Sequence, residues 1–182
     1  MAYKHRLMLA SWHEFYMLLG TAAAALVALL FVAASIGTGY LSAERGSPTR
    51  TFTSPIVFHY TYVLFISLIA LIPDIVDATF ALVVGATAAA ALVYSTFVLI
   101  RVLRSSITDL DDRFGYGVTP PAAYAATLAA AVFLGARSTI GPHLLAGALM
   151  ILLLVNIRNA WDLTVFFAQR RNEGDRTPPA PS

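Results

Sequence analysis

The chain has 182 residues, of which 58% are hydrophobic and only 12% are charged, and its mean hydropathy is +0.73. A soluble domain of this length cannot bury so much apolar surface in one core, whereas a lipid bilayer covers it, so the composition indicates a membrane protein. The chain has no cysteine, which excludes disulfide bonds and thiolate metal sites. Its net charge is only +2, which argues against nucleic-acid binding.

Five hydrophobic segments are predicted to cross the membrane as helices. In chain order they cover residues 15–36, 56–72, 78–103, 122–136 and 144–168. A crossing helix needs about 20 apolar residues, so the fourth segment is short and is expected to extend through Pro120 or to sit partly buried. The predicted fold is an all-α transmembrane bundle of five helices over residues 1–172. Residues 173–182 form a proline-rich polar tail that is expected to be disordered.

Two further patterns bear on the architecture. Proline follows serine or threonine at Pro55 and Pro120, and each proline is expected in the first turn of its helix, where it loses no hydrogen bond. The run Thr21–Val27 recurs as Thr87–Val93. This recurrence fits a duplicated helical hairpin whose copies run the same way through the membrane, or a chance match between alanine-rich runs.

The orientation follows from lysine and arginine in the short loops, which are enriched on the cytoplasmic side. One side would carry Lys4, Arg6 and Arg137. The other would carry Arg45, Arg50, Arg101, Arg104, Arg113, Arg170, Arg171 and Arg176. We therefore expect a multi-pass protein of the bacterial inner (plasma) membrane with a cytoplasmic C-terminus, although the basic N-terminal flank favours the opposite orientation.

Four polar residues interrupt the last apolar segment: Asn156, Arg158, Asn159 and Asp162. A charge at the centre of a bilayer costs roughly 2.5–3.5 kcal/mol on insertion scales, so these residues need a compensating role. At about 100° per residue, Arg158, Asn159 and Asp162 share an arc of about 100°. Arg158 and Asp162 are spaced to pair within the helix. The cluster is either a lock between helices or the lining of a path for ions or protons.

His59 is the predicted partner of this intramembrane polar cluster. It lies about one turn into the second segment, on the same side of the membrane as Asp162, and Tyr60 and Tyr62 flank it. One hypothesis is a pH-sensitive hydrogen bond between His59 and Asp162. The alternative is a belt of amphipathic aromatic side chains at the membrane interface.

The opposite side of the membrane gathers a second set of polar residues. His13, Glu14 and His143 could in principle hold a metal or a haem, but lone histidines at helix ends are usually interfacial, and we predict no metal and no cofactor. Asp74 and Asp77 could form an acidic ring at a pore mouth in an oligomer. Equally, they suit the positive end of a helix dipole.

Small residues recur every fourth position in two of the segments. One stripe is Gly20, Ala24 and Ala28, and the other is Ala123, Thr127, Ala131 and Gly135. Such stripes allow close helix packing and also permit self-association. Catalytic motifs of nucleotide-binding, serine-hydrolase and zinc-protease types are missing from the sequence, so we predict that the protein is not an enzyme.

Two stretches resemble an uncharacterised family of small bacterial multi-pass membrane proteins. One begins at Trp12-His13-Glu14-Phe15-Tyr16 and continues through the alanine-rich run, and the other is the Asn159-Ala160-Trp161-Asp162-Leu163 stretch. The resemblance covers mainly the first and last segments. It implies a bacterial membrane location and no catalytic activity.

The expected function is that of a non-enzymatic integral membrane protein. It would be a scaffold or accessory subunit that associates through small-residue and polar helix faces, with itself or with a partner membrane protein. The alternative is an oligomeric ion or proton channel whose lining includes His59, Asn159 and Asp162. The expected partners are the lipid bilayer and other membrane helices, and no nucleic acid.

Overall fold

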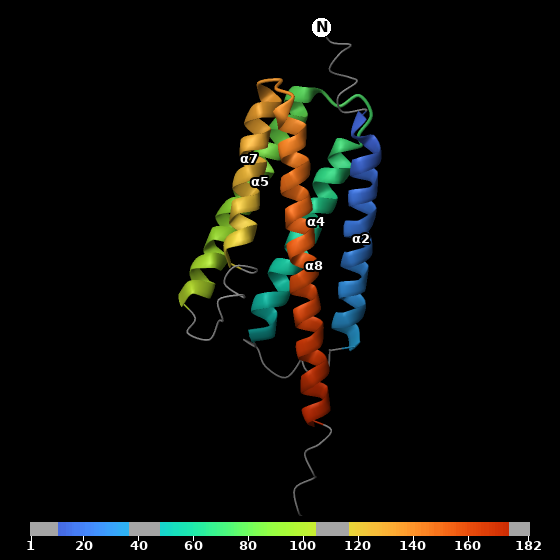
Figure 1. The fold of residues 1–182 in the computed structure, drawn as a ribbon, viewed down its shortest axis with the longest axis vertical. Helices are drawn as coiled ribbons and strands as arrows, with labels where there is room; N and C mark the ends of the chain where they lie inside the picture. The colour runs from blue at the N-terminus through green and yellow to red at the C-terminus, as the bar shows by residue number, and fades with distance from the viewer. Residues whose placement is uncertain (1–10, 37–47, 105–116, 175–182) are drawn as a thin grey trace, which may run out of the picture.

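The protein is described by a computed structural model that covers residues 11–36, 48–104 and 117–174. Within these residues the chain is all-helical, and its five helices run alternately down and up one bundle (Figure 1). They are α2 (His13–Ile36), α4 (Pro48–Ala70), α5 (Asp77–Arg104), α7 (Thr119–Gly135) and α8 (Ile140–Gly174). The predictions of an all-α fold and of five helices are confirmed.

Three of the helices are long and apolar enough to cross a membrane. The qualifying stretches are His13–Val32 of α2, Asp77–Arg101 of α5 and Ile140–Asp162 of α8. The other two helices contribute shorter apolar stretches, Pro55–Ala70 and Thr119–Gly135. Length and composition thus support three spans directly, where the sequence predicted five.

Of the two prolines predicted in the first turn of a helix, Pro55 is not found there and Pro120 is. α4 begins at Pro48, so Pro55 lies inside the helix rather than in its first turn. α7 begins at Thr119 with proline in its first turn, as a helix extended through Pro120 requires. The last helix continues to Gly174, two residues into the predicted tail, and residues 175–182 lie outside the described residues.

The helices pack as two hairpins with α8 between them. α2 pairs with α4, α5 pairs with α7, and α8 packs against α7 and α4. α5 and α2 lie at the two edges of the bundle (Figure 1). α4 and α5 are joined by a short connection but have little contact with each other, so they are the one pair of consecutive described helices that does not pack closely.

Small residues allow the two helices of each hairpin to pack closely against each other. A Cβ atom built on Gly20 of α2 would lie 3.0 Å from the Cβ of Ser67 in α4, and one on Gly85 of α5 would lie 3.4 Å from the Cβ of Ala131 in α7. Close backbone approach of this kind is how helices associate in a membrane, where water does not drive them together.

The two predicted small-residue stripes have different fates. Ala123, Thr127 and Ala131 are buried in the bundle, as a packing stripe requires, whereas Gly135 at the end of this stripe is exposed. Of the stripe predicted in α2, Gly20 is buried, whereas Ala24 and Ala28 are exposed. The inward face of α2 is instead carried by Tyr16, Leu19, Ala23 and Leu30.

The turn between α7 and α8 is a Schellman motif. The N–H of Ser138 donates to the carbonyl of Phe133 at 2.9 Å, and the N–H of Arg137 donates to that of Leu134 at 3.0 Å, which is the bond pair that defines this helix end. Arg137 takes a positive φ of 58° there. Gly141 then packs so tightly that an added Cβ would lie 2.8 Å from the backbone nitrogen of Leu134, so this hairpin closes only over glycine.

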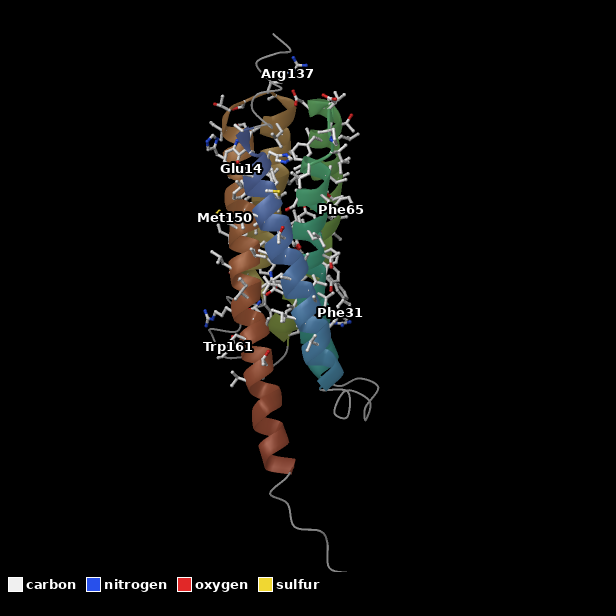
Figure 2. The ribbon with its side chains drawn as sticks, turned by 90° about the vertical axis from the view of Figure 1, so that its right-hand side faces the viewer. Glu14, Phe31, Phe65, Arg137, Met150 and Trp161 are labelled. Carbon is white, nitrogen blue, oxygen red and sulfur yellow. The ribbon has the colours of Figure 1, made fainter. Side chains whose placement is uncertain are left out.

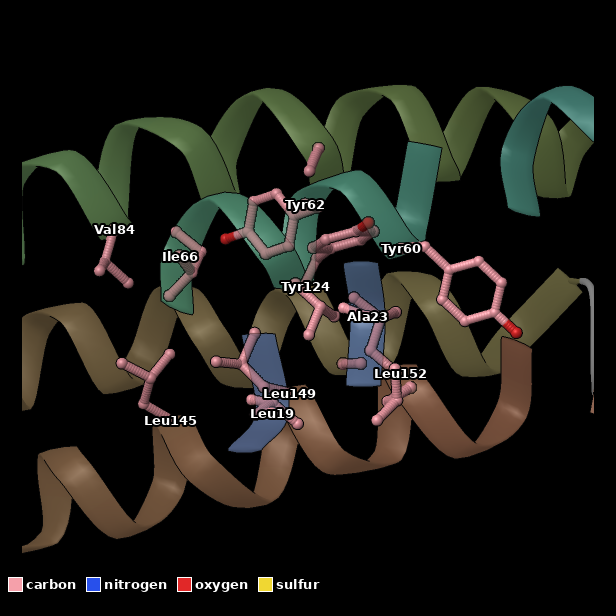
Figure 3. Packing of buried hydrophobic residues seen from close by; sticks show 14 of the residues in the cluster. Leu19, Ala23, Tyr60, Tyr62, Ile66, Val84, Tyr124, Leu145, Leu149 and Leu152 are labelled. Carbon is pink, nitrogen blue, oxygen red and sulfur yellow. The ribbon is translucent and has the colours of Figure 1, made fainter. Parts of the chain in front are cut away.

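Apolar side chains occupy both the inside and the outside of the bundle. The core includes the large buried side chains labelled in Figure 3, among them Ile66, Val84, Leu145 and Leu149. On the outside, large apolar side chains such as Phe31, Phe65, Met150 and Trp161 point away from the helices (Figure 2). Apolar surface on both faces is the pattern expected of a protein surrounded by lipid.

Candidate functional site

The four polar residues of α8 divide between two faces of the helix. Asn156 and Asn159 are buried, with exposures of 0% and 2%, whereas Arg158 and Asp162 are exposed. Among the described residues, no ion pair within 4 Å joins Arg158 to Asp162, so the predicted pair within the helix does not form. The sequence placed Arg158, Asn159 and Asp162 on one stripe, but Asn159 faces the bundle and the two charged residues face outwards.

Asn156 lies at the centre of the buried face of α8. Its side-chain amide donates from Nδ2 to the carbonyl of Leu152, one turn earlier, at 2.6 Å. Since a carbonyl only accepts, the atom facing Leu152 must be the amide nitrogen, and the oxygen Oδ1 points elsewhere. That oxygen is buried and has no hydrogen-bond partner among the described residues.

His59 bonds to α7 and not to Asp162. Its ring nitrogen Nδ1 lies 2.6 Å from the hydroxyl of Tyr124, and the histidine is only 3% exposed. The hypothesis of a bond between His59 and Asp162 is wrong, because Asp162 lies on the outer face of α8 while His59 is enclosed by its own bundle. The hydrogen bond of His59 therefore links α4 to α7, two helices that share few other contacts.

Aromatic rings extend this contact into α5. Tyr62 meets Tyr124 edge to face, with ring centroids 4.9 Å apart, and Phe58 lies 4.5 Å from Tyr94 of α5. Edge-to-face and tilted pairs of this kind contribute beyond the area that they bury. His59 and these aromatic residues thus join α4, α5 and α7 at one level of the bundle.

Tyr124 was not among the functional residues predicted from the sequence. The signal that could have found it is its isolation, because it is the single tyrosine in the predicted fourth segment, which is otherwise built of small and apolar residues. A phenol in such a helix needs a polar partner when it is buried, and the histidine in the second segment was available.

The polar residues at the other end of the bundle do not form a metal site. His143 donates from Nδ1 to the carbonyl of Thr139 at 2.8 Å, and its ring packs edge to face on Trp12 at 5.0 Å. His13 and Glu14 are exposed. Among the described residues, no group of three or more His, Cys, Asp or Glu side chains is placed to hold a metal ion.

The two acidic residues at this end belong to the connection between α4 and α5. Asp74 is exposed, with a positive φ of 55°, and Asp77 is half-buried in the first turn of α5. Both take part in polar interactions. The position of Asp77 is the one in which a carboxylate is stabilised by the helix dipole.

Comparison with known proteins adds no family. The chain matches no family model, and no curated protein or solved structure is significantly similar to it. The resemblance of the first and last segments to small bacterial membrane proteins stays a prediction.

Proposed function

We propose that the protein is a non-enzymatic membrane scaffold that self-associates through the outer face of α8. The observation that carries this proposal is the exposure of Arg158 and Asp162 on a helix that spans Ile140–Asp162 in apolar sequence. Each charge facing lipid would cost roughly 2.5–3.5 kcal/mol near the centre of the bilayer and less towards its surface. A second copy of the chain would supply a carboxylate for Arg158 and a guanidinium for Asp162.

The apolar residues around the two charges support an interface between helices. Ile151, Leu154 and Val165 are exposed on the same side of α8 as Arg158 and Asp162. Together the five residues advance by steps of three, four, four and three. That spacing matches the seam of a helix pair, in which apolar residues recur every 3.5 residues on average. We call these five residues the α8 seam.

The charges on the α8 seam are complementary to themselves. In a twofold dimer the same surface of each copy meets its counterpart, so a contact from residue i to residue j occurs twice. Arg158 would reach the partner's Asp162, and Asp162 would receive the partner's Arg158. The two residues are one helical turn apart, about 6 Å along the axis, which the long arginine side chain can span.

The interior of the bundle supports a scaffold rather than a path through one copy. The hydroxyl of Ser67 donates to the carbonyl of Val63 at 2.8 Å, and that of Thr127 donates to Ala123 at 2.9 Å. These groups, like the amide nitrogen of Asn156, are satisfied by their own helices. Large side chains such as Tyr124, Leu149 and Leu152 fill the space between the helices (Figure 3).

Charge reversal tests the self-association. Arg158→Asp and Asp162→Arg each place like charges across the twofold axis, and we expect each to lower the dimer association constant at least about tenfold, a cost of about 1.4 kcal/mol. The double variant restores the opposite charges and should recover dimers. Energy transfer between labelled copies in liposomes measures the association. Arg104→Asp, an exposed arginine on α5, is the matched control and should have no effect.

The alternative function is an oligomeric ion or proton channel. It is favoured by the same exposure of Asp162, because several copies arranged in a ring would direct this carboxylate to a shared axis. Liposome flux separates the two functions. A channel conducts and loses conductance in Asp162→Asn, whereas the scaffold forms dimers that conduct nothing.

The proposed topology has five spans in the bacterial inner membrane with the C-terminus in the cytoplasm. It is supported by the directions of α4 and α7, which run opposite to the three long apolar helices that they pack between (Figure 1), and by Arg101 and Arg104 in the last turn of α5, at the lower end. A duplicated hairpin is supported by the equivalent pairing of α2 with α4 and of α5 with α7. His59 and Tyr124 each follow a proline, Pro55 or Pro120, by four residues.

A further inference from the structure

Two buried polar atoms on facing helices are left without a hydrogen-bond partner among the described residues: the hydroxyl oxygen of Tyr60 on α4 and the oxygen Oδ1 of Asn156 on α8. Tyr60 is only 1% exposed and Asn156 is 0% exposed. A buried polar group with no hydrogen-bond partner destabilises the fold, because it has lost its bonds to water and gained none in return. The two atoms are complementary, since a phenol donates a proton and a carbonyl oxygen accepts one.

Contacts with α2 fix the relative heights of α4 and α8. α2 runs in the same direction as α8, and Trp12 packs on His143 near the upper end of both helices. α2 runs opposite to α4, and Gly20 lies against Ser67. Distances along the three helices can therefore be counted from one common level.

This count brings Tyr60 and Asn156 to nearly the same depth. Tyr60 lies seven residues below Ser67, which puts it about 22 Å below the level of Trp12 at 1.5 Å per residue. Asn156 lies thirteen residues below His143, or about 20 Å below the same level. The difference is within the length of one tyrosine side chain.

The directions of the side chains agree with this placement. Tyr60 extends from α4 past Leu152 towards the following turn of α8 (Figure 3), and that turn carries Asn156. Leu145, Leu149 and Leu152 are all fully buried on the stripe that contains Asn156, and α4 and α8 pack against each other. The Tyr60 hydroxyl and Oδ1 of Asn156 therefore lie at similar depth on two helices that pack against each other, and the two atoms do not bond to each other.

We propose that a water molecule binds between α4 and α8. The water accepts a hydrogen bond from the hydroxyl of Tyr60 and donates a hydrogen bond to Oδ1 of Asn156. Buried waters in proteins typically make about three hydrogen bonds to polar groups that would otherwise be unsatisfied. In a bundle surrounded by lipid the bound water replaces a direct bond between the helices and fixes their register. This site is independent of the α8 seam, which lies on the opposite face of α8.

Removal of the Tyr60 hydroxyl discriminates between a hydrated and a dry site by the sign of its effect. If the site is hydrated, Tyr60→Phe removes a bond and lowers the unfolding midpoint in detergent by about 2–4 °C. If the site is dry, the same substitution removes an unpaired buried hydroxyl and leaves the midpoint unchanged or raises it. A neutral or stabilising Tyr60→Phe would overturn the proposal.

A double-mutant cycle tests whether the two residues share one water. We expect the losses from Tyr60→Phe and Asn156→Leu to be less than additive in the double variant, because either substitution alone breaks the bridge. Tyr62→Phe is the matched control. The Tyr62 hydroxyl is also buried, but it is directed to Thr87 of α5 and its ring contacts Tyr124 on the α7 side, so its effect should add to that of Asn156→Leu.

Infrared spectroscopy in D₂O provides a readout that does not depend on stability. An O–D stretching band of an internal water should be lost in both Tyr60→Phe and Asn156→Leu and kept in Tyr62→Phe. Additive losses in the cycle, or no band that responds to both substitutions, would contradict a shared water.

Discussion

The inner and outer faces of α8 both carry polar residues on an apolar helix, but the residues differ in charge and in what they contact. On the inner face, Asn156 and Asn159 are amides that carry no net charge and are buried against other helices. On the outer face, Arg158 and Asp162 are charged and exposed within the same two turns. The amides are neutral and can make their hydrogen bonds inside the bundle. The charged side chains lie on the outer face, where a second molecule can supply the opposite charges.

This division separates folding from assembly within one helix. The inner face holds the single copy together through packing and hydrogen bonds, and its loss should unfold the bundle. The outer face contributes little to the fold of one copy, and its loss should change only association. Paired substitutions on the two faces can test each half of this comparison.

The largest expected contrast is between two leucines of α8. Leu152 is 1% exposed and Leu154 is 60% exposed. Leu152→Ala leaves a cavity in the core and should cost about 2–5 kcal/mol of unfolding free energy. Leu154→Ala should cost well under ~1 kcal/mol when single copies are unfolded in dilute detergent. Equal losses at the two positions would contradict the assignment of the faces.

A smaller loss is expected when the bond between α4 and α7 is removed. Tyr124→Phe keeps the ring but leaves Nδ1 of His59 without the partner that lies 2.6 Å away, so we expect a loss of about 1–3 kcal/mol. Denaturant unfolding measures the loss. In the His59→Leu background the same substitution should have a much smaller effect, and an unchanged effect there would show that the bond contributes nothing.

The sequence was sufficient for the helices but not for the direction of their polar faces. Apolar runs located all five helices, because a chain in lipid must satisfy its backbone within each segment. The helical period gave the angles between Arg158, Asn159 and Asp162 but not which angle faces the bundle. That direction depends on where α4 and α7 pack, and the sequence carries no direct signal for it.

Partners across the bundle were also beyond local reasoning. His59 and Asp162 were matched by their depth in the membrane, yet depth alone does not say which helices are neighbours. Tyr124 satisfies His59 because α4 and α7 approach at this level, although neither lies next to the other in sequence. The prediction for Pro55 was also wrong, because α4 begins seven residues before this proline.

Cysteine cross-linking along α8 tests the two-faced helix most directly, because the chain has no cysteine of its own and each substitution reports a single position. In liposomes, Ile151→Cys and Leu154→Cys lie on the α8 seam and should form disulfide-linked dimers readily. Met150→Cys and Ile157→Cys are also exposed but lie to one side of the seam, and they should cross-link weakly. Cross-links that peak at positions 150 and 157, or that occur at none of the four positions, would contradict self-association through this face.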